Sequence, residues 1–121
     1  MIGPLVLLLA YTFPETVQPG EKLIVVGQGE FQSCTIVARV TGTASVRVAP
    51  SSTATEKEKV RGGQMLSLCG EDGDYVAVVY KPSSDGETDC GVAAPPPFVA
   101  AYRGPCRFGW VESRKLELVE G

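Results

Sequence analysis

Residues 64–80, QMLSLCGEDGDYVAVVY, contain the pattern that decides the fold. Gln64 to Cys69 is a largely apolar run that predicts a strand. Glu71-Asp72-Gly73-Asp74 follows it and predicts a hairpin turn, because Gly73 can adopt a positive φ. Tyr75 to Tyr80 then returns as a second strand, rich in the β-prone residues Val and Tyr. Side chains alternate along a strand, so Tyr75 and Tyr80 should point to opposite faces.

Further short strands are predicted on both sides of this hairpin. They are Lys22–Val26, Thr35–Val40, Ala44–Val48, Phe108–Val111 and Leu116–Val119. No segment shows the 3.6-residue apolar stripe of a long helix. Many short strands at close spacing predict an all-β fold, a small barrel of about five to seven strands. Its inward face should hold Val46, Val76, Val78 and Val111, which alternate with polar or small residues.

Two stretches lack the pattern of a strand. Ser51 to Gly63 is polar and contains the charge run Glu56-Lys57-Glu58-Lys59, which predicts a solvated loop or a short turn of helix. Pro82 to Pro105 is rich in Pro and Gly and shows no strand-like periodicity, which predicts a long, loop-like insertion at residues 81–108.

The composition excludes several classes of function. The 121 residues carry 11 basic and 14 acidic side chains, a net charge of −3, with no basic stripe, which argues against nucleic-acid binding. There is no histidine, which excludes Ser-His-Asp and Cys-His catalysis and most zinc sites. The acidic residues of 71–74 and 85–89 either form a weak calcium site or face water. We predict that the chain is not an enzyme and holds neither metal nor cofactor.

The four cysteines lie at positions 34, 69, 90 and 106, and none of their spacings is CxxC. Four cysteines allow three disulfide pairings. We favour Cys34–Cys69 with Cys90–Cys106, because the second pair would clip a stretch rich in Gly and Pro. Two disulfides indicate an oxidising compartment. A four-cysteine zinc site and buried free thiols are the alternatives.

Residues 1–13, MIGPLVLLLAYTF, are almost continuously apolar. They are too short to span a bilayer, which needs roughly 20 residues, so no stable membrane span is predicted. The segment either resembles the apolar core of an export signal or forms a buried strand or helix of the domain. Export would agree with the disulfides and predicts a periplasmic or extracellular location. We divide the chain into residues 1–34, with the apolar segment and one short strand, and the barrel at 35–121.

Three motifs allow the chain to be compared with a known protein family. Residues 44–51 read ASVRVAPS, residues 73–78 read GDYVAV, and residues 109–116 read GWVESRKL. Together they resemble the opening, the middle hairpin and the closing signature of a bacterial Src-homology-3 domain, over about two thirds of the chain. The resemblance implies a Src-homology-3-like barrel that is interrupted by the insertion at 81–108.

Several residues of these motifs also have a physical interpretation. Arg47 is expected to brace a loop through its guanidinium, and Pro50 closes the strand before that loop. Gly109 before Trp110 indicates a backbone that must bend or approach another strand closely. Trp110 either lines a half-exposed groove or caps the core of the barrel.

The resemblance implies a non-enzymatic module that binds a peptide in an aromatic-lined groove. Candidate groove residues are Tyr75, Tyr102, Phe108 and Trp110. The chain's own Pro95, Pro96, Pro97 and Phe98 would either pack on the domain beside Trp110 or form a tolerated loop.

The function predicted from the sequence is therefore that of an exported binding module of the bacterial cell envelope. Its partner would be a cell-wall peptide or a protein segment. The alternative is a structural or assembly protein that oligomerises through its N-terminal segment.

Overall fold

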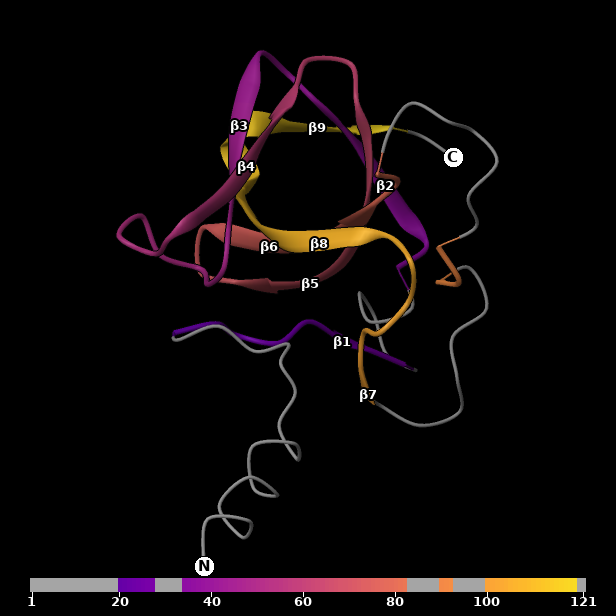
Figure 1. The fold of residues 1–121 in the computed structure, drawn as a ribbon. Helices are drawn as coiled ribbons and strands as arrows, with labels where there is room; N and C mark the ends of the chain where they lie inside the picture. The colour runs from indigo at the N-terminus through magenta and orange to yellow at the C-terminus, as the bar shows by residue number, and fades with distance from the viewer. Residues whose placement is uncertain (1–19, 28–33, 83–89, 93–99, 120–121) are drawn as a thin grey trace, which may run out of the picture.

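The computed structural model describes residues 20–27, 34–82, 90–92 and 100–119. These residues form two antiparallel sheets, and their one helical turn is the 3-10 helix η1, Ser113–Lys115. The strands are β1 (Val25–Val26), β2 (Ile36–Val40), β3 (Thr43–Arg47), β4 (Glu56–Arg61), β5 (Met65–Asp72), β6 (Tyr75–Tyr80), β7 (Ala100–Ala101), β8 (Arg107–Glu112) and β9 (Leu116–Val119). The large sheet has the order β4-β3-β8-β6-β5-β2-β9, whereas β1 pairs with β7 (Figure 1). The predicted all-β class is confirmed.

One long ribbon of two antiparallel strands is bent at a corner. Arg39 faces Met65 before the corner and Thr43 faces Arg61 after it, so the register is the same on both sides. Gly42 and Gly63 lie at the corner with φ angles of 82° and 93°, in the left-handed region that favours glycine. The bend lets the strands wrap around a common interior (Figure 1). The sheet does not close, because β4 and β9 remain its two edges.

The predicted hairpin forms the middle of the large sheet. β5 is longer than expected and runs to Asp72, and Gly73 adopts the predicted positive φ, at 63°. All six residues of β6 are buried. Because side chains alternate, β6 divides the apolar residues of the protein into two clusters, one on each side of the sheet. Tyr80 belongs to one cluster and Tyr75 to the other, so the prediction of opposite faces is confirmed.

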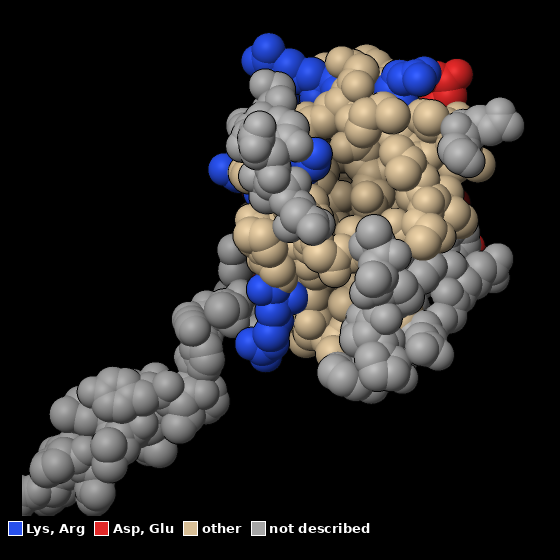
Figure 2. Space-filling view, turned by 90° about the vertical axis from the view of Figure 1, so that its right-hand side faces the viewer, with Lys and Arg blue, Asp and Glu red and all other residues tan. Residues whose placement is uncertain are grey.

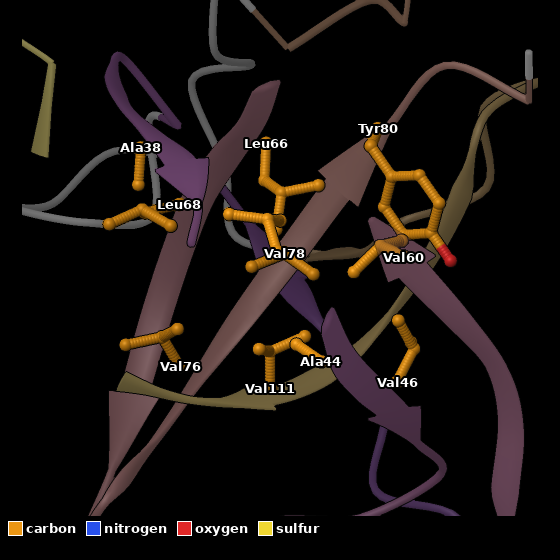
Figure 3. Close-up of a cluster of buried hydrophobic side chains, with 11 residues drawn as sticks. Ala38, Ala44, Val46, Val60, Leu66, Leu68, Val76, Val78, Tyr80 and Val111 are labelled. Carbon is orange, nitrogen blue, oxygen red and sulfur yellow. The ribbon is translucent and has the colours of Figure 1, made fainter. Parts of the chain in front are cut away.

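The inner cluster lies inside the bent sheet, where side chains from several strands converge (Figure 3). Its buried members are Ala38, Val40, Ala44, Val46, Val60, Leu66, Leu68, Val76, Val78, Tyr80 and Val111. The four inward valines expected from the sequence are all among them. Most of these side chains are small or β-branched, which suits the narrow interior of a small, strongly bent sheet.

The outer cluster lies on the opposite side of β5, β6 and β8, and the small sheet of β1 and β7 covers it (Figure 1). Its buried members are Ile24, Cys34, Cys69, Tyr75, Ala77, Val79, Val92, Tyr102, Cys106 and Trp110. Backbone hydrogen bonds attach the cover. The amide of Lys22 donates to the carbonyl of Val48, and that of Tyr102 donates to the carbonyl of Ile24. Residues 22–26 therefore pack on the same unit as the large sheet.

Both predicted disulfides are present in the structure. Cys34 is bonded to Cys69, with Cα atoms 4.2 Å apart, and Cys90 is bonded to Cys106, with Cα atoms 5.3 Å apart. Cys69 occupies a β-bulge, since the register of β5 against β6 shifts between Leu68 and Gly70. The zinc site and the free thiols that were considered as alternatives are thereby excluded, because all four cysteines are in disulfides.

The prediction of a solvated loop or helical turn for the charge run was wrong, because residues 56–61 form the edge strand β4. The alternation becomes visible in the structure: Val60 is buried and Glu58 is half-buried, while their neighbours face water. Charged residues on an exposed edge also discourage pairing with another chain. A second strand that sequence reasoning missed, β7, lies within the insertion.

Candidate functional site

The four aromatic residues predicted to line a groove do lie together, but they are covered. Tyr75, Tyr102 and Trp110 are 8%, 8% and 4% exposed, and Phe108 is half-buried. The indole Nε1 of Trp110 donates to the carbonyl of Lys22 at 3.0 Å. The structure therefore shows these four residues as covered and not as the lining of an open groove. The small sheet of β1 and β7 covers these residues. The apolar pattern of the strands in the large sheet does not indicate that such a cover exists.

The described ends of the insertion are attached to this covered cluster. The hydroxyl of Tyr102 donates to the carbonyl of Cys90 at 2.9 Å and accepts from the amide of Cys106 at 3.1 Å. The rings of Tyr102 and Phe108 meet edge to face, with centroids 5.9 Å apart. Val92, Tyr102 and Cys106 belong to the same buried cluster as Trp110, so the described parts of the insertion pack beside it. The proline-rich part predicted to pack there, residues 95–98, lies outside the described residues.

The structural roles predicted for two motif residues are confirmed. The guanidinium of Arg47 donates to the carbonyl of Ala54 at 2.9 Å and so braces the loop between β3 and β4, in which Pro50 lies. Gly109 lies where β8 approaches β3, and a Cβ at this position would be 2.3 Å from Cγ1 of Val46. The close approach inferred from the sequence is thus present.

An open cleft of about 790 Å³ lies elsewhere, beside the corner of the bent ribbon. Its walls come from β4, β5 and their connection, from the ends of β2 and β6, and from the two ends of the insertion. The lining residues are Val37, Glu58, Lys59, Val60, Arg61, Gly62, Gly63, Gln64, Met65, Leu66, Ser67, Val79, Tyr80, Lys81, Pro82, Cys90 and Arg107. A cleft of this size is within the range of ligand sites.

A hydrogen-bonded cluster fixes the polar part of the cleft. Both carboxylate oxygens of Glu58 accept hydrogen bonds, Oε2 from the hydroxyl of Tyr80 and Oε1 from the guanidinium of Arg107 at 3.0 Å. Tyr80 is only 3% exposed. Its burial, followed by the hydrogen bond to Glu58 and the negative charge of that group, raises the pKa of Tyr80 far above its usual value of 10.

This cluster makes stability depend on pH in the alkaline range. The pKa of Tyr80 is raised in the folded state. The contribution of Tyr80 to the free energy of unfolding is therefore complete below pH 10 and is lost as the pH rises above that value. The wild type should lose up to about 1.4 kcal/mol of unfolding free energy per pH unit through this group. Tyr80→Phe should cost about 2 kcal/mol at pH 8, since a hydrogen bond to a charged group is lost.

Urea unfolding of both proteins between pH 8 and pH 11.5 measures this dependence. Below pH 10 the difference between wild type and Tyr80→Phe should be constant, and above it the two curves should converge. A difference that stays the same up to pH 11.5 would contradict a raised pKa for Tyr80.

Positive charge is concentrated around the cleft. Among the described residues, its lining contains four basic side chains, at positions 59, 61, 81 and 107, and one acidic side chain, Glu58. Figure 2 shows one face of the molecule, where a hollow lies in a largely uncharged surface, with Lys and Arg side chains around the edge and acidic atoms at the upper right. An acidic protein thus presents a locally basic cleft.

Apolar side chains form the remaining walls. Met65 is 46% exposed, and Val37, which pairs with Ser67 in the sheet, is half-buried. Pro82 is an exposed member of the same lining. Exposed apolar surface next to charged groups is typical of a binding site. No motif in the sequence indicated this cleft.

The acidic turn considered for calcium forms an ion pair instead. The carboxylate of Asp72 lies 2.6 Å from the ammonium of Lys22. Within the ranges that the structure describes, no three acidic or cysteine side chains are grouped as metal ligands. The second acidic stretch, residues 85–89, lies outside the described residues.

Comparison with known proteins gives no assignment: no family model, no curated protein and no solved structure matches the chain. In the described part of the chain, no helix has the length and apolar character needed to cross a membrane. The arguments for function therefore rest on the cleft and on the disulfides.

Proposed function

We propose that this protein is an exported, non-enzymatic binding module of the bacterial cell envelope that holds a peptide segment in the cleft. The single observation that carries the proposal is the cleft itself, which is open, has apolar walls and has a basic rim. Its polar groups are held in place before any ligand arrives, because Glu58 is fixed by both Tyr80 and Arg107. Preorganisation of this kind lowers the entropic cost of binding.

Binding agrees better with the groups in the cleft than catalysis does. The hydroxyl of Tyr80 is committed to Glu58, and its raised pKa keeps it protonated and therefore a poor nucleophile or base. Both oxygens of Glu58 already accept hydrogen bonds, so this carboxylate is poorly placed to take a proton from a substrate. The ligand we propose is a cell-wall peptide or a segment of another protein.

The arrangement of strands supports a Src-homology-3-like barrel as the scaffold. The first and last motifs of the resemblance come together, because Arg47 of β3 pairs with Trp110 of β8. The middle motif lies on β6, which pairs with β8 along its whole length. The bent ribbon adds the remaining wall of the interior.

The disulfides support export. Both are buried or half-buried links between distant parts of the chain, Cys34 to Cys69 and Cys90 to Cys106. Disulfides of this structural kind form and persist in oxidising compartments such as the periplasm or the extracellular space. Residues 1–13, for which an export segment and a buried strand or helix are the two interpretations, lie outside the described residues.

A sedimentation assay with purified bacterial cell wall tests the proposed function. The wild type should be recovered with the wall, and Met65→Trp, which adds bulk inside the cleft at an exposed position, should be recovered several-fold less. Leu118→Trp is the matched control, because Leu118 is 70% exposed and is not one of the residues that line the cleft. Equal recovery of wild type and Met65→Trp, or no recovery of either, would overturn the proposal.

A further inference from the structure

The charges of the cleft specify the ligand more narrowly, if the proposed peptide-binding function is correct. We infer that the ligand is an acidic peptide, in which carboxylates flank an apolar side chain. The carboxylates would be bound by Arg61 and Arg107, and the apolar side chain would rest against Met65.

Both arginines have N–H donors that can bind a ligand. Arg107 donates from one nitrogen to Glu58, and its side chain is 53% exposed, so the rest of its five-donor guanidinium can reach a ligand. Arg61 is exposed and forms no ion pair with any described residue. Guanidinium groups bind carboxylates through two parallel hydrogen bonds, which gives them both strength and direction.

Glu58, the only acidic side chain among the described residues of the lining, does not oppose an acidic ligand. Glu58 lies between Tyr80 and Arg107, and each of its oxygens already accepts a hydrogen bond. Its negative charge is thus compensated inside the wall of the cleft. The next basic residue, Lys59, is paired with Glu56 at 2.9 Å, so we assign the ligand contacts to the two arginines.

Met65 lines the same cleft as the two arginines, so we assign it as the contact of an apolar side chain of the ligand. This residue lies just after the corner that carries Arg61, and its exposed thioether side chain adapts readily to ligands of different shape. A nucleic acid would meet the same positive charges. However, the described aromatic rings are buried or half-buried, so none of them offers an open face on which bases could stack.

Three capped pentapeptides that differ only in charge test the inference. They are Gly-Asp-Leu-Asp-Gly, Gly-Asn-Leu-Asn-Gly and Gly-Lys-Leu-Lys-Gly, titrated into the full-length protein by calorimetry. The acidic peptide should bind at least about ten-fold more tightly than its amide counterpart, and the basic peptide should be the weakest. The affinity for the acidic peptide should also fall as the salt concentration rises.

Two variants test whether the preference for the acidic peptide arises in the cleft. Arg61→Gln should weaken binding of the acidic peptide by about ten-fold and leave the amide peptide unchanged, because Arg61 forms no ion pair with any described residue. Arg114→Gln makes the same change in net charge outside the cleft, on a side chain that is 73% exposed, and should change neither affinity by more than about two-fold.

The outcomes separate this inference from the proposed function. Equal binding of the acidic and amide peptides would overturn the inference and leave a peptide-binding cleft. Absence of binding by all three peptides, or a preference for a single-stranded oligonucleotide over the acidic peptide, would also overturn it. The sedimentation assay with cell wall judges the proposed function independently.

Discussion

Replacing both Cys34 and Cys69 by alanine should lower the free energy of unfolding by about 4 kcal/mol, the largest effect we expect from removing a single link. The disulfide closes a loop with a sequence separation of 35 residues, and it attaches the start of β2 to the bulge of β5. Without it the unfolded chain gains the conformational freedom of that loop. Alanine is the suitable replacement, because a polar side chain would be buried at both positions.

Denaturant unfolding of the oxidised proteins measures this effect. The pair Cys90→Ala with Cys106→Ala serves as comparison, since its loop spans 16 residues and should contribute about 3 kcal/mol. Thiol titration of the denatured wild type should find no reactive thiol without reductant and all four cysteines with it. Free thiols in the unreduced protein, or a change below about 1 kcal/mol in the first variant, would contradict the role given to this disulfide.

Gly109→Ala should destabilise the protein by about 3 kcal/mol, although it adds only a methyl group. The new Cβ would lie 2.3 Å from Cγ1 of Val46 and 3.0 Å from the carbonyl oxygen of Arg47. Val46 is fully buried in the inner cluster, and the carbonyl belongs to the backbone of β3, so neither can move freely. The contact between β8 and β3 would have to open.

Gly70→Ala is the matched control for this substitution. Gly70 also lies within a strand, but a Cβ there would be 3.8 Å from Cβ of Ala77, an ordinary van der Waals contact. It should change stability by less than about 1 kcal/mol. Thermal or urea unfolding compares the two variants directly. Equal free energies of unfolding for the two variants would contradict the close packing of β8 on β3.

Much of the fold was predictable because local pattern and burial agree. The run Tyr75–Tyr80 is apolar at every position, and β6 is indeed buried on both faces. The strand predicted at Leu116–Val119 has the observed bounds. Arg47 was expected to brace a loop, and it does so. In each case a few neighbouring residues contain the information, so no distant part of the chain had to be known.

The errors arose where a distant segment decides the environment. In the charge run, Glu58 faces inward only because Tyr80 and Arg107, which are far along the sequence, donate hydrogen bonds to it. Trp110 is covered by the β1–β7 layer, in which β1 lies before the first barrel motif of the chain and β7 lies in the insertion before the last one. The sequence contains these residues, but their spacing does not show that they meet.

The cleft was unpredictable for the same reason. Its lining extends from Val37 to Arg107, and the bend of the ribbon brings these parts together. A single exposed methionine such as Met65 is unremarkable in a sequence. It becomes informative when two arginines and a compensated glutamate lie around the same cleft.

The most direct test of a cleft that binds acidic peptide is chemical-shift mapping. The amide signals of isotopically labelled protein would be followed while the capped peptide Gly-Asp-Leu-Asp-Gly is added. We expect the largest shifts at Arg61, Met65 and Arg107, with little change at Arg114, which does not line the cleft. Shifts that centre on β9 or on the β1–β7 layer, or a cleft whose signals do not move at saturating peptide, would contradict the account.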